Sequence, residues 1–196
     1  VEHAVSYQAA VATTSKVTTY QSGSRGSISD CNGNILAYDE NSYDVMFYRD
    51  PDKTTPVDSA RYTNALMEAI SIIEAGGGTV ENGFYIVMDN DGTYHYDFGV
   101  SSELAIASRK KNFVEACRFS NPELTAEEAY LILRKSWQIP DDMPFEQAAK
   151  IMSVRQEAVL NSWHAYEGVL VARNVNLSVV TELDMRQSEL VGIETQ

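Results

Sequence analysis

Ser108 and Lys111 are the two residues whose types and spacing come nearest to covalent catalysis. In a helix they lie on one face, where a lysine can activate a serine hydroxyl for attack on an acyl group. Such a site also needs a Lys-Thr-Gly strand. The nearest segment, Lys53-Thr54-Thr55, precedes the serine and predicts a loop that leads into a helix. Because Arg109, Lys110 and Lys111 are consecutive and basic, the sequence favours a solvent-facing helix surface here.

The other motifs that suggest ligand chemistry predict turns instead. Asp89-Asn90-Asp91-Gly92 lacks the glycine and the final glutamate that an EF-hand loop requires, and predicts a hairpin turn. Gly76-Gly77-Gly78 follows a predicted helix and lacks the ending of a phosphate-binding loop, so it predicts a helix end. His3, His95 and His164 share no ligand spacing. The sequence therefore predicts no metal and no cofactor.

The charge and the cysteine content limit the classes of partner. The chain has 196 residues, and 15 Lys and Arg against 28 Asp and Glu give a net charge of −13. A chain this acidic repels phosphate backbones, so we expect no nucleic-acid partner. No stretch approaches the ~18 apolar residues of a membrane-spanning helix. Cys31 and Cys117 are too few for a disulfide scaffold, and the sequence leaves open whether they pair.

The secondary-structure signals form three blocks, with strands at both ends and helices between them. In the first block, Asn32-Gly33 predicts a hairpin turn, because both residues tolerate positive φ, and a strand follows over Tyr43–Tyr48. The middle block predicts helices that begin at Thr55, Ser101 or Ser102, Thr125 and Pro144, with one hairpin over 84–98. The last block predicts a strand over 168–172, a helix over 179–186 and a strand over 190–194.

This order predicts an α+β fold in which both ends of the chain form a β-rich base that carries a mostly helical head with one hairpin. We place the base at residues 1–54 and 153–196 and the head at residues 55–152. From the residues alone, the chain is typical of a binding or scaffolding domain.

One segment carries a specific family signature. Arg25 to Ala37 resembles the Arg-Gly-x-Ile-x-Asp-Arg-Asn-Gly-x-x-Leu-Ala signature of penicillin-binding proteins, particularly the class B transpeptidases. Four later segments resemble further family blocks in the expected order: Ser153–Arg155, Trp163–Tyr166, Val171–Val175 and Leu190–Glu194. Two positions depart from the family pattern, since Cys31 stands where the family usually has Arg, and Val191 where it usually has Pro. The first departure puts an Arg-dependent salt bridge in doubt.

The resemblance implies the pedestal, or dimerisation, domain of a membrane-anchored protein of peptidoglycan synthesis. Such a domain is elongated and non-catalytic, and it positions a transpeptidase domain whose catalytic serine we expect beyond Gln196. The resemblance also implies an extracytoplasmic location at the bacterial cell membrane, an N-terminal membrane helix outside this chain, contacts with partners such as a polytopic glycosyltransferase and, as one option, a homodimer. The structural and interaction residues that it implies are Arg25, Gly26, Asp30, Asn32, Gly33, Arg155 and Asn174.

Two alternatives remain open at this stage. The first is a minimal serine acyl-enzyme or β-lactam-binding protein that uses Ser108 and Lys111. The second is a secreted adhesion domain that shares only the hairpin signature.

Overall fold

The computed structural model describes residues 28–32, 35–37, 42–162 and 167–196, which divide between a short unit before residue 41 and a compact unit over 41–196. In the short unit, β1 (Ile28–Ser29) pairs with β2 (Ile35–Ala37) in antiparallel orientation. The hairpin predicted around Asn32 is thereby confirmed, although Gly33 of its turn lies outside the described residues.

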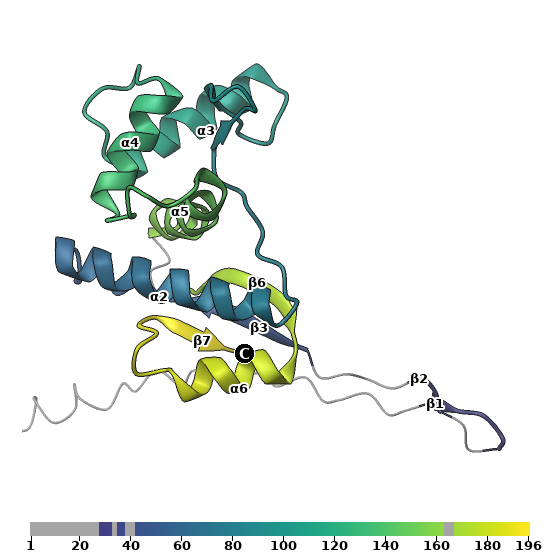
Figure 1. Ribbon diagram of the computed structural model, residues 1–196. Coiled ribbons are helices and arrows are strands. Elements are labelled where there is room, and N and C mark those ends of the chain that lie inside the picture. Colours follow the sequence, from purple (N-terminus) through teal and green to yellow (C-terminus); the bar gives the residue numbers. More distant parts are fainter. Residues whose placement is uncertain (1–27, 33–34, 38–41, 163–166) are drawn as a thin grey trace, which may run out of the picture. The chain divides into compact units, whose positions relative to one another are not determined.

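A three-stranded antiparallel sheet forms the base of the compact unit. Its order is β6-β3-β7, with β3 (Tyr43–Phe47) between β6 (Val169–Val175) and β7 (Ile193–Thr195). The sheet thus joins a strand that precedes the helical stretch at 56–160 to two strands that follow it (Figure 1). Its strands therefore come from both sides of this stretch, and each finds its partners across it.

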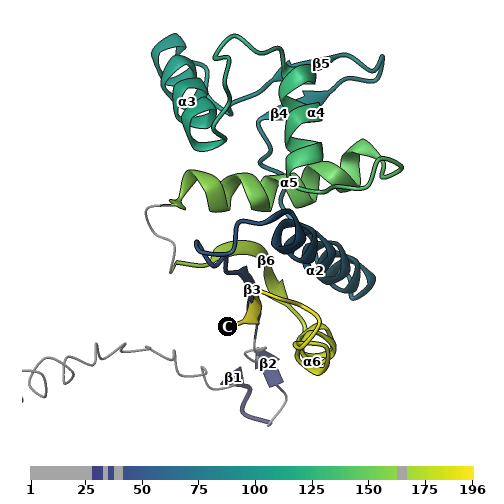
Figure 2. The same ribbon diagram turned by 90° about the vertical axis from the view of Figure 1, so that its left-hand side faces the viewer.

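Among the described residues of the compact unit, five helices and one further hairpin accompany the sheet. The helices are α2 (Pro56–Ala75), α3 (Glu103–Ala116), α4 (Ala126–Ser136), α5 (Phe145–Leu160) and α6 (Leu177–Met185). The hairpin pairs β4 (Ile86–Met88) with β5 (Tyr94–Tyr96). Figure 2 shows α2 and α6 beside the sheet, with α3, α4 and the hairpin on the opposite side of α5. The predicted α+β class is confirmed.

Local capping signals account for several helix starts. Thr55 accepts a hydrogen bond from the Asp58 backbone N–H while the Asp58 carboxylate accepts one from the Thr55 N–H, and Thr125 and Glu128 do the same for α4. These reciprocal bonds satisfy backbone donors that a helix end leaves without partners. Asn176 caps α6 through its side-chain oxygen. The predicted helix starts at these three caps are confirmed.

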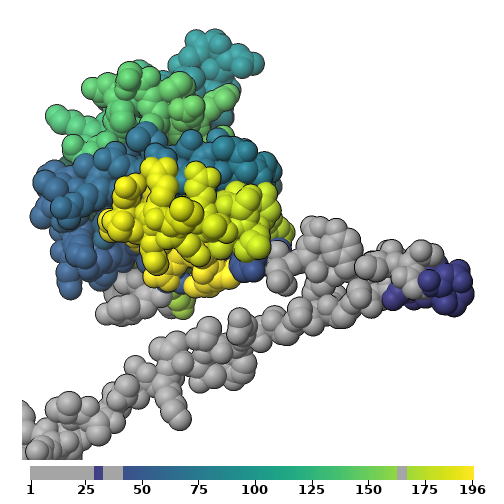
Figure 3. Space-filling model, turned by 60° about the horizontal axis from the view of Figure 1, so that its bottom comes forward, coloured from purple at the N-terminus to yellow at the C-terminus, as the bar shows by residue number. Residues whose placement is uncertain are grey.

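The core is continuous from the sheet to the helices. Phe47 of β3 packs edge-on against Tyr62 of α2, with ring centroids 5.5 Å apart, and Leu66 and Ile73 of α2 are fully buried. The apolar face of α2 therefore covers the sheet, and Figure 3 shows the C-terminal segment in yellow against α2 in blue. On the other side of α5, Phe113 is the buried centre of an aromatic cluster.

The last strand differs from its predicted range. The sequence predicts a strand over 190–194, but the strand begins only at Ile193. Leu190 and Gly192 lie in tight turns, in which the Ile193 N–H donates to the Leu190 carbonyl and Gly192 has a φ of +83°. This positive φ is closed to most L residues and interrupts the extended backbone. The division into base and head stays a prediction, and its boundary at residue 153 falls inside α5.

Candidate interaction site

The predicted interaction residues that the structure describes belong to the β1–β2 turn, to β6 and to α5. Arg25, Gly26 and Gly33 lie outside the described residues. In the β1–β2 turn, the Asn32 N–H donates to the Asp30 carboxylate at 2.8 Å, which is an Asx turn. The hairpin therefore owes part of its geometry to Asp30.

Asn174 lies at an irregularity in β6. The pairing of β3 with β6 shifts register between Tyr43 and Val45, and Asn174 there adopts a φ of +53°. Asparagine tolerates this left-handed conformation better than most residues. Its backbone N–H donates to the Asp44 carboxylate at 3.1 Å, so the role visible for Asn174 is to shape the sheet.

Arg155 of α5 is the most unusual of the predicted residues, because it is a cation with only 6% of its surface exposed. Its Nη1 donates to the Ser59 carbonyl and to Thr63 Oγ1, both at 3.0 Å, and its Nη2 donates to Ser59 Oγ at 2.9 Å. All of these acceptors belong to α2. Arg155 thus links α5 to the first half of α2 through three hydrogen bonds.

The two hydroxyls that accept hydrogen bonds from Arg155 also donate hydrogen bonds to carbonyls at the C-terminal end of α4. Thr63 Oγ1 donates to the Trp137 carbonyl at 2.5 Å, and Ser59 Oγ donates to the Ser136 carbonyl at 3.1 Å. The last carbonyls of a helix have no partner within the helix and carry its partial negative charge. The Arg155 cluster, defined as Arg155, Ser59, Thr63, Ser136 and Trp137, therefore fastens three helices together.

No carboxylate of the described residues forms an ion pair with Arg155, and its neighbours are aromatic. Its guanidinium lies 5.6 Å from the ring centroid of Trp137 and 5.9 Å from that of Tyr62. Burial, together with the nearby positive charge of Arg49, lowers the pKa of Arg155 to about 10. The site thus holds a guanidinium whose charge is balanced by dipoles and aromatic faces alone.

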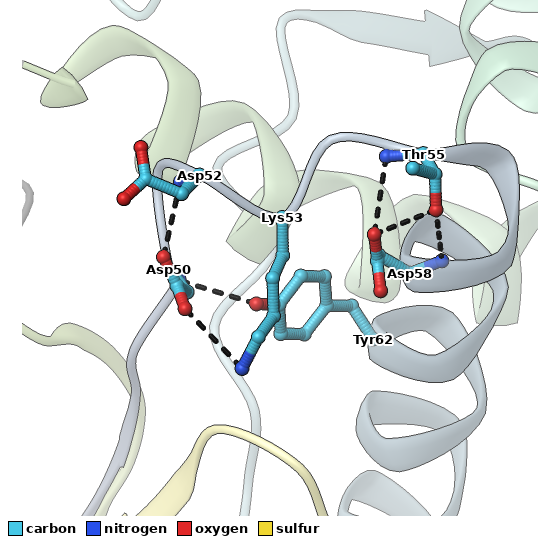
Figure 4. Close-up of polar contacts among 6 residues, drawn as sticks. All are labelled: Asp50, Asp52, Lys53, Thr55, Asp58 and Tyr62. Carbon is cyan, nitrogen blue, oxygen red and sulfur yellow. Dashed lines mark hydrogen bonds and ion pairs between the residues drawn. The ribbon is translucent and has the colours of Figure 1, made fainter.

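The loop between β3 and α2 is ordered by its own polar contacts (Figure 4). The Asp50 N–H donates to the Tyr62 hydroxyl at 3.2 Å, and the Asp50 carboxylate accepts from the Asp52 N–H at 3.0 Å. Lys53 Nζ lies 3.2 Å from the Asp50 carboxylate. The Asp52 hydrogen bond, together with Lys53, lowers the pKa of Asp50. These contacts therefore fix the conformation of the loop that leads into α2.

A groove of about 1320 Å³ lies between this loop and the C-terminal ends of α3, α4 and α5. We call it the basic groove, because six of the described residues that line it are cations, against three glutamates. The cations are Arg49, Lys53, Arg109, Arg118, Lys135 and Arg155. The buried rings of Phe47, Tyr62 and Trp137 lie behind these side chains. The groove brings Arg155 together with residues that the sequence places far from it.

The comparisons with known proteins assign the chain to a family. Residues 20–196 match the family described as the penicillin-binding protein dimerisation domain. The chain belongs to this family. A search of curated proteins finds no significant match. The resemblance inferred from the Arg25–Ala37 signature is confirmed at the level of this domain, which is non-catalytic.

In this dimerisation domain, Ser108 and Lys111 do not form a serine–base pair. Both lie on the exposed surface of α3, and Lys111 Nζ is directed to Glu115, 3.9 Å away, rather than to the serine. Neither residue lines the basic groove. The predicted solvent-facing surface agrees with this arrangement.

The other features considered in the sequence carry no site among the described residues. No cluster of three metal-ligating side chains occurs in the part of the dimerisation domain that the structure describes, and none of its helices is long and apolar enough to span a membrane. Cys31 and Cys117 are both free thiols, and burial raises the pKa of Cys117 to about 12. Asp89–Gly92 forms the predicted hairpin turn. His3 and His164 lie outside the described residues.

Two buried polar residues beside Arg155 were missed by the sequence reasoning. Gln156 is 1% exposed; it accepts from the Tyr85 N–H at 2.9 Å and donates to the Gly83 carbonyl at 3.0 Å. Ser153 accepts from the Gly83 N–H at 2.8 Å. The available signal was the run of polar residues after Met152 in a helix that is otherwise apolar on that side. In the dimerisation domain this run fixes the segment before β4 to α5.

Proposed function

We propose that this chain is the spacer and interaction module of a membrane-anchored penicillin-binding protein in peptidoglycan synthesis. It holds a transpeptidase domain at its working distance from the membrane, on the extracytoplasmic side of the cell membrane, and contacts partner proteins such as a polytopic glycosyltransferase. The observation that supports this proposal is the match to the dimerisation-domain family over residues 20–196.

The packing of the compact unit is consistent with a rigid spacer. The base sheet, α2, α4 and α5 are joined by a continuous core and by the Arg155 cluster, so the unit resists deformation. A rigid unit transmits position from one end to the other, whereas a flexible linker does not. The second copy implied by the family description makes a homodimer part of the same proposal.

Labelling with a fluorescent penicillin tests the non-catalytic part of the proposal. We expect no covalent label on this chain, because Lys111 is paired with Glu115 on an open helix surface. The Ser108→Ala variant is the matched control. A label on the natural chain that disappears in Ser108→Ala would overturn the proposal in favour of an acyl-enzyme.

Co-purification tests the interaction part. The chain, extended by its own membrane helix, is expressed with a polytopic glycosyltransferase from the same cell and isolated in detergent. We expect the two proteins to co-elute, and sedimentation of the chain alone reports the homodimer. Elution as separate species, with a purely monomeric chain, would contradict the interaction role.

A further inference from the structure

The basic groove concentrates positive charge on a strongly acidic protein. The chain carries 15 Lys and Arg and a net charge of −13, yet six cations line this one groove. Three of them have partners, since Lys53 pairs with Asp50, Arg109 Nη1 donates to the Phe98 carbonyl at 2.6 Å, and Arg155 donates to Ser59 and Thr63. The side chains of Arg49, Arg118 and Lys135 make no ion pair or hydrogen bond within the described residues. The groove therefore holds cationic groups that are available to a ligand.

Arg155 is the buried anchor of this charge. Its guanidinium is held by Ser59, Thr63 and two aromatic rings, and it forms no ion pair with a carboxylate of the described residues. Burial lowers the pKa of Arg155, and the nearby positive charge of Arg49 acts in the same direction. Like charges that lie close together favour an anion between them, because the anion relieves their repulsion.

The size and lining of the groove indicate a peptide rather than a small molecule. Its volume of about 1320 Å³ exceeds the roughly 300–1,000 Å³ of small-molecule sites. Pro51, Pro56 and Leu160 offer apolar surface beside the cations, as in interfaces that bind mixed polar and apolar side chains.

The charge pattern also argues against a phosphate polymer or an anionic membrane. Glu115, Glu157 and Glu167 also line the groove. A uniformly charged polyanion meets these carboxylates, and the net charge of −13 repels it at long range. An extended peptide places single carboxylates opposite single cations and avoids both penalties.

We propose that the basic groove binds an extended acidic segment of a partner protein, whose carboxylates pair with Arg49, Arg118 and Lys135. This inference deepens the interaction role proposed above and rests on it. It assigns that role a place in the fold and a partner chemistry, namely carboxylate side chains interspersed with apolar ones.

Fluorescence anisotropy with the full chain tests this proposal. The probe is a labelled peptide that alternates glutamate with leucine, and its glutamine counterpart is the uncharged control. We expect the glutamate peptide to bind at least about tenfold more tightly than the glutamine peptide, and the affinity to fall as salt screens the charges. Equal binding of both peptides would overturn the proposal.

The variant Arg49→Gln tests the site, because Arg49 is only partly buried and lies outside the hydrogen bonds of the Arg155 cluster. We expect it to weaken the glutamate peptide about tenfold while the thermal midpoint stays unchanged. Arg173→Gln makes the same charge change on the exposed surface of β6, outside the groove, and should leave the affinity within about twofold of the natural chain. Equal losses in both variants would mean that net charge, and not the groove, governs binding.

Inorganic polyphosphate and phosphatidylglycerol vesicles complete the test. If either binds in an Arg49-dependent way and the glutamate peptide does not, the groove serves a phosphate ligand and the proposal is wrong. Failure of peptide binding would leave the penicillin and co-purification results untouched, so failure of the groove assignment is distinguishable from failure of the proposed function.

Discussion

The removal of Arg155 gives the sharpest test of how the three helices are held together. Arg155→Ala deletes three hydrogen bonds from a charged donor, each worth about 1.5 to 3 kcal/mol. The substitution also removes the free-energy cost of burying a cation. The pKa of Arg155 is lowered from 12.5 to about 10, which corresponds to a cost of about 3 kcal/mol at 1.36 kcal/mol per pKa unit. The difference leaves an expected loss of about 2 to 6 kcal/mol in the free energy of unfolding.

For a chain of this length, each kcal/mol lowers the thermal midpoint by about 2 to 4 °C. We therefore expect Arg155→Ala to lower the midpoint by at least about 5 °C, measured by circular dichroism on the full chain. Arg155→Lys keeps the charge but presents a point cation instead of a planar fork, so it should fall between Arg155→Ala and the natural chain. Arg173→Ala, which truncates an exposed arginine on β6, is the control and should change the midpoint little.

A double-mutant cycle shows whether Arg155 acts through the hydroxyl of Thr63. Thr63→Val removes the acceptor of Arg155 and the donor to the Trp137 carbonyl while keeping the side-chain volume. The two substitutions should be non-additive by about 0.5 kcal/mol or more, because they break the same hydrogen-bonded path. A midpoint for Arg155→Ala equal to that of Arg173→Ala, or strict additivity with Thr63→Val, would refute this account.

The remaining predictions concern turns and caps. Gly192→Ala should lower the thermal midpoint clearly more than Gly92→Ala: both glycines have a φ near +85°, but a Cβ at residue 192 would lie 2.3 Å from the Tyr48 carbonyl oxygen, whereas at residue 92 it would meet open space. Equal shifts would mean that backbone strain alone matters and that the sheet yields to the clash. Thr125→Ala should cost about 1 kcal/mol at pH 7. Because hydrogen bonds from Thr125 lower the pKa of Glu128, this capping contribution is present above the unfolded-state pKa and is lost as pH falls through the folded one. The midpoints of Thr125→Ala and the natural chain should therefore converge between pH 5 and about pH 3, and a constant gap would contradict the role of Glu128.

The elements that could be predicted from the sequence are those whose causes are local. Thr55, Thr125 and Asn176 cap helices through residues two or three positions away, and the turn at Asp89–Gly92 closes within itself. The turn at Gly192 was missed because its signal resembles the end of a strand. Its positive φ becomes necessary only where the backbone passes close to Tyr48 on β3.

The candidate site was only partly predictable. Arg155 was identified through the family resemblance, but its acceptors Ser59 and Thr63 lie almost a hundred residues earlier, at separations of 96 and 92. No periodicity or spacing links them. The basic groove could not be predicted for the same reason. Its lining residues come together only when the ends of α3, α4 and α5 pack beside the β3–α2 loop.

The position of β3 in the middle of the sheet has a consequence for the way the protein is made. Phe47 pairs with Val169 on one side and with Ile193 on the other, so both neighbours of β3 are synthesised only after α2 to α5. Until then β3 presents two open edges, and an unpaired apolar strand is a template for pairing with other chains. Closing loops of this length is entropically costly and slows folding. The helices are therefore expected to form first and the sheet last, which makes β3 the segment that a nascent chain most needs to have shielded.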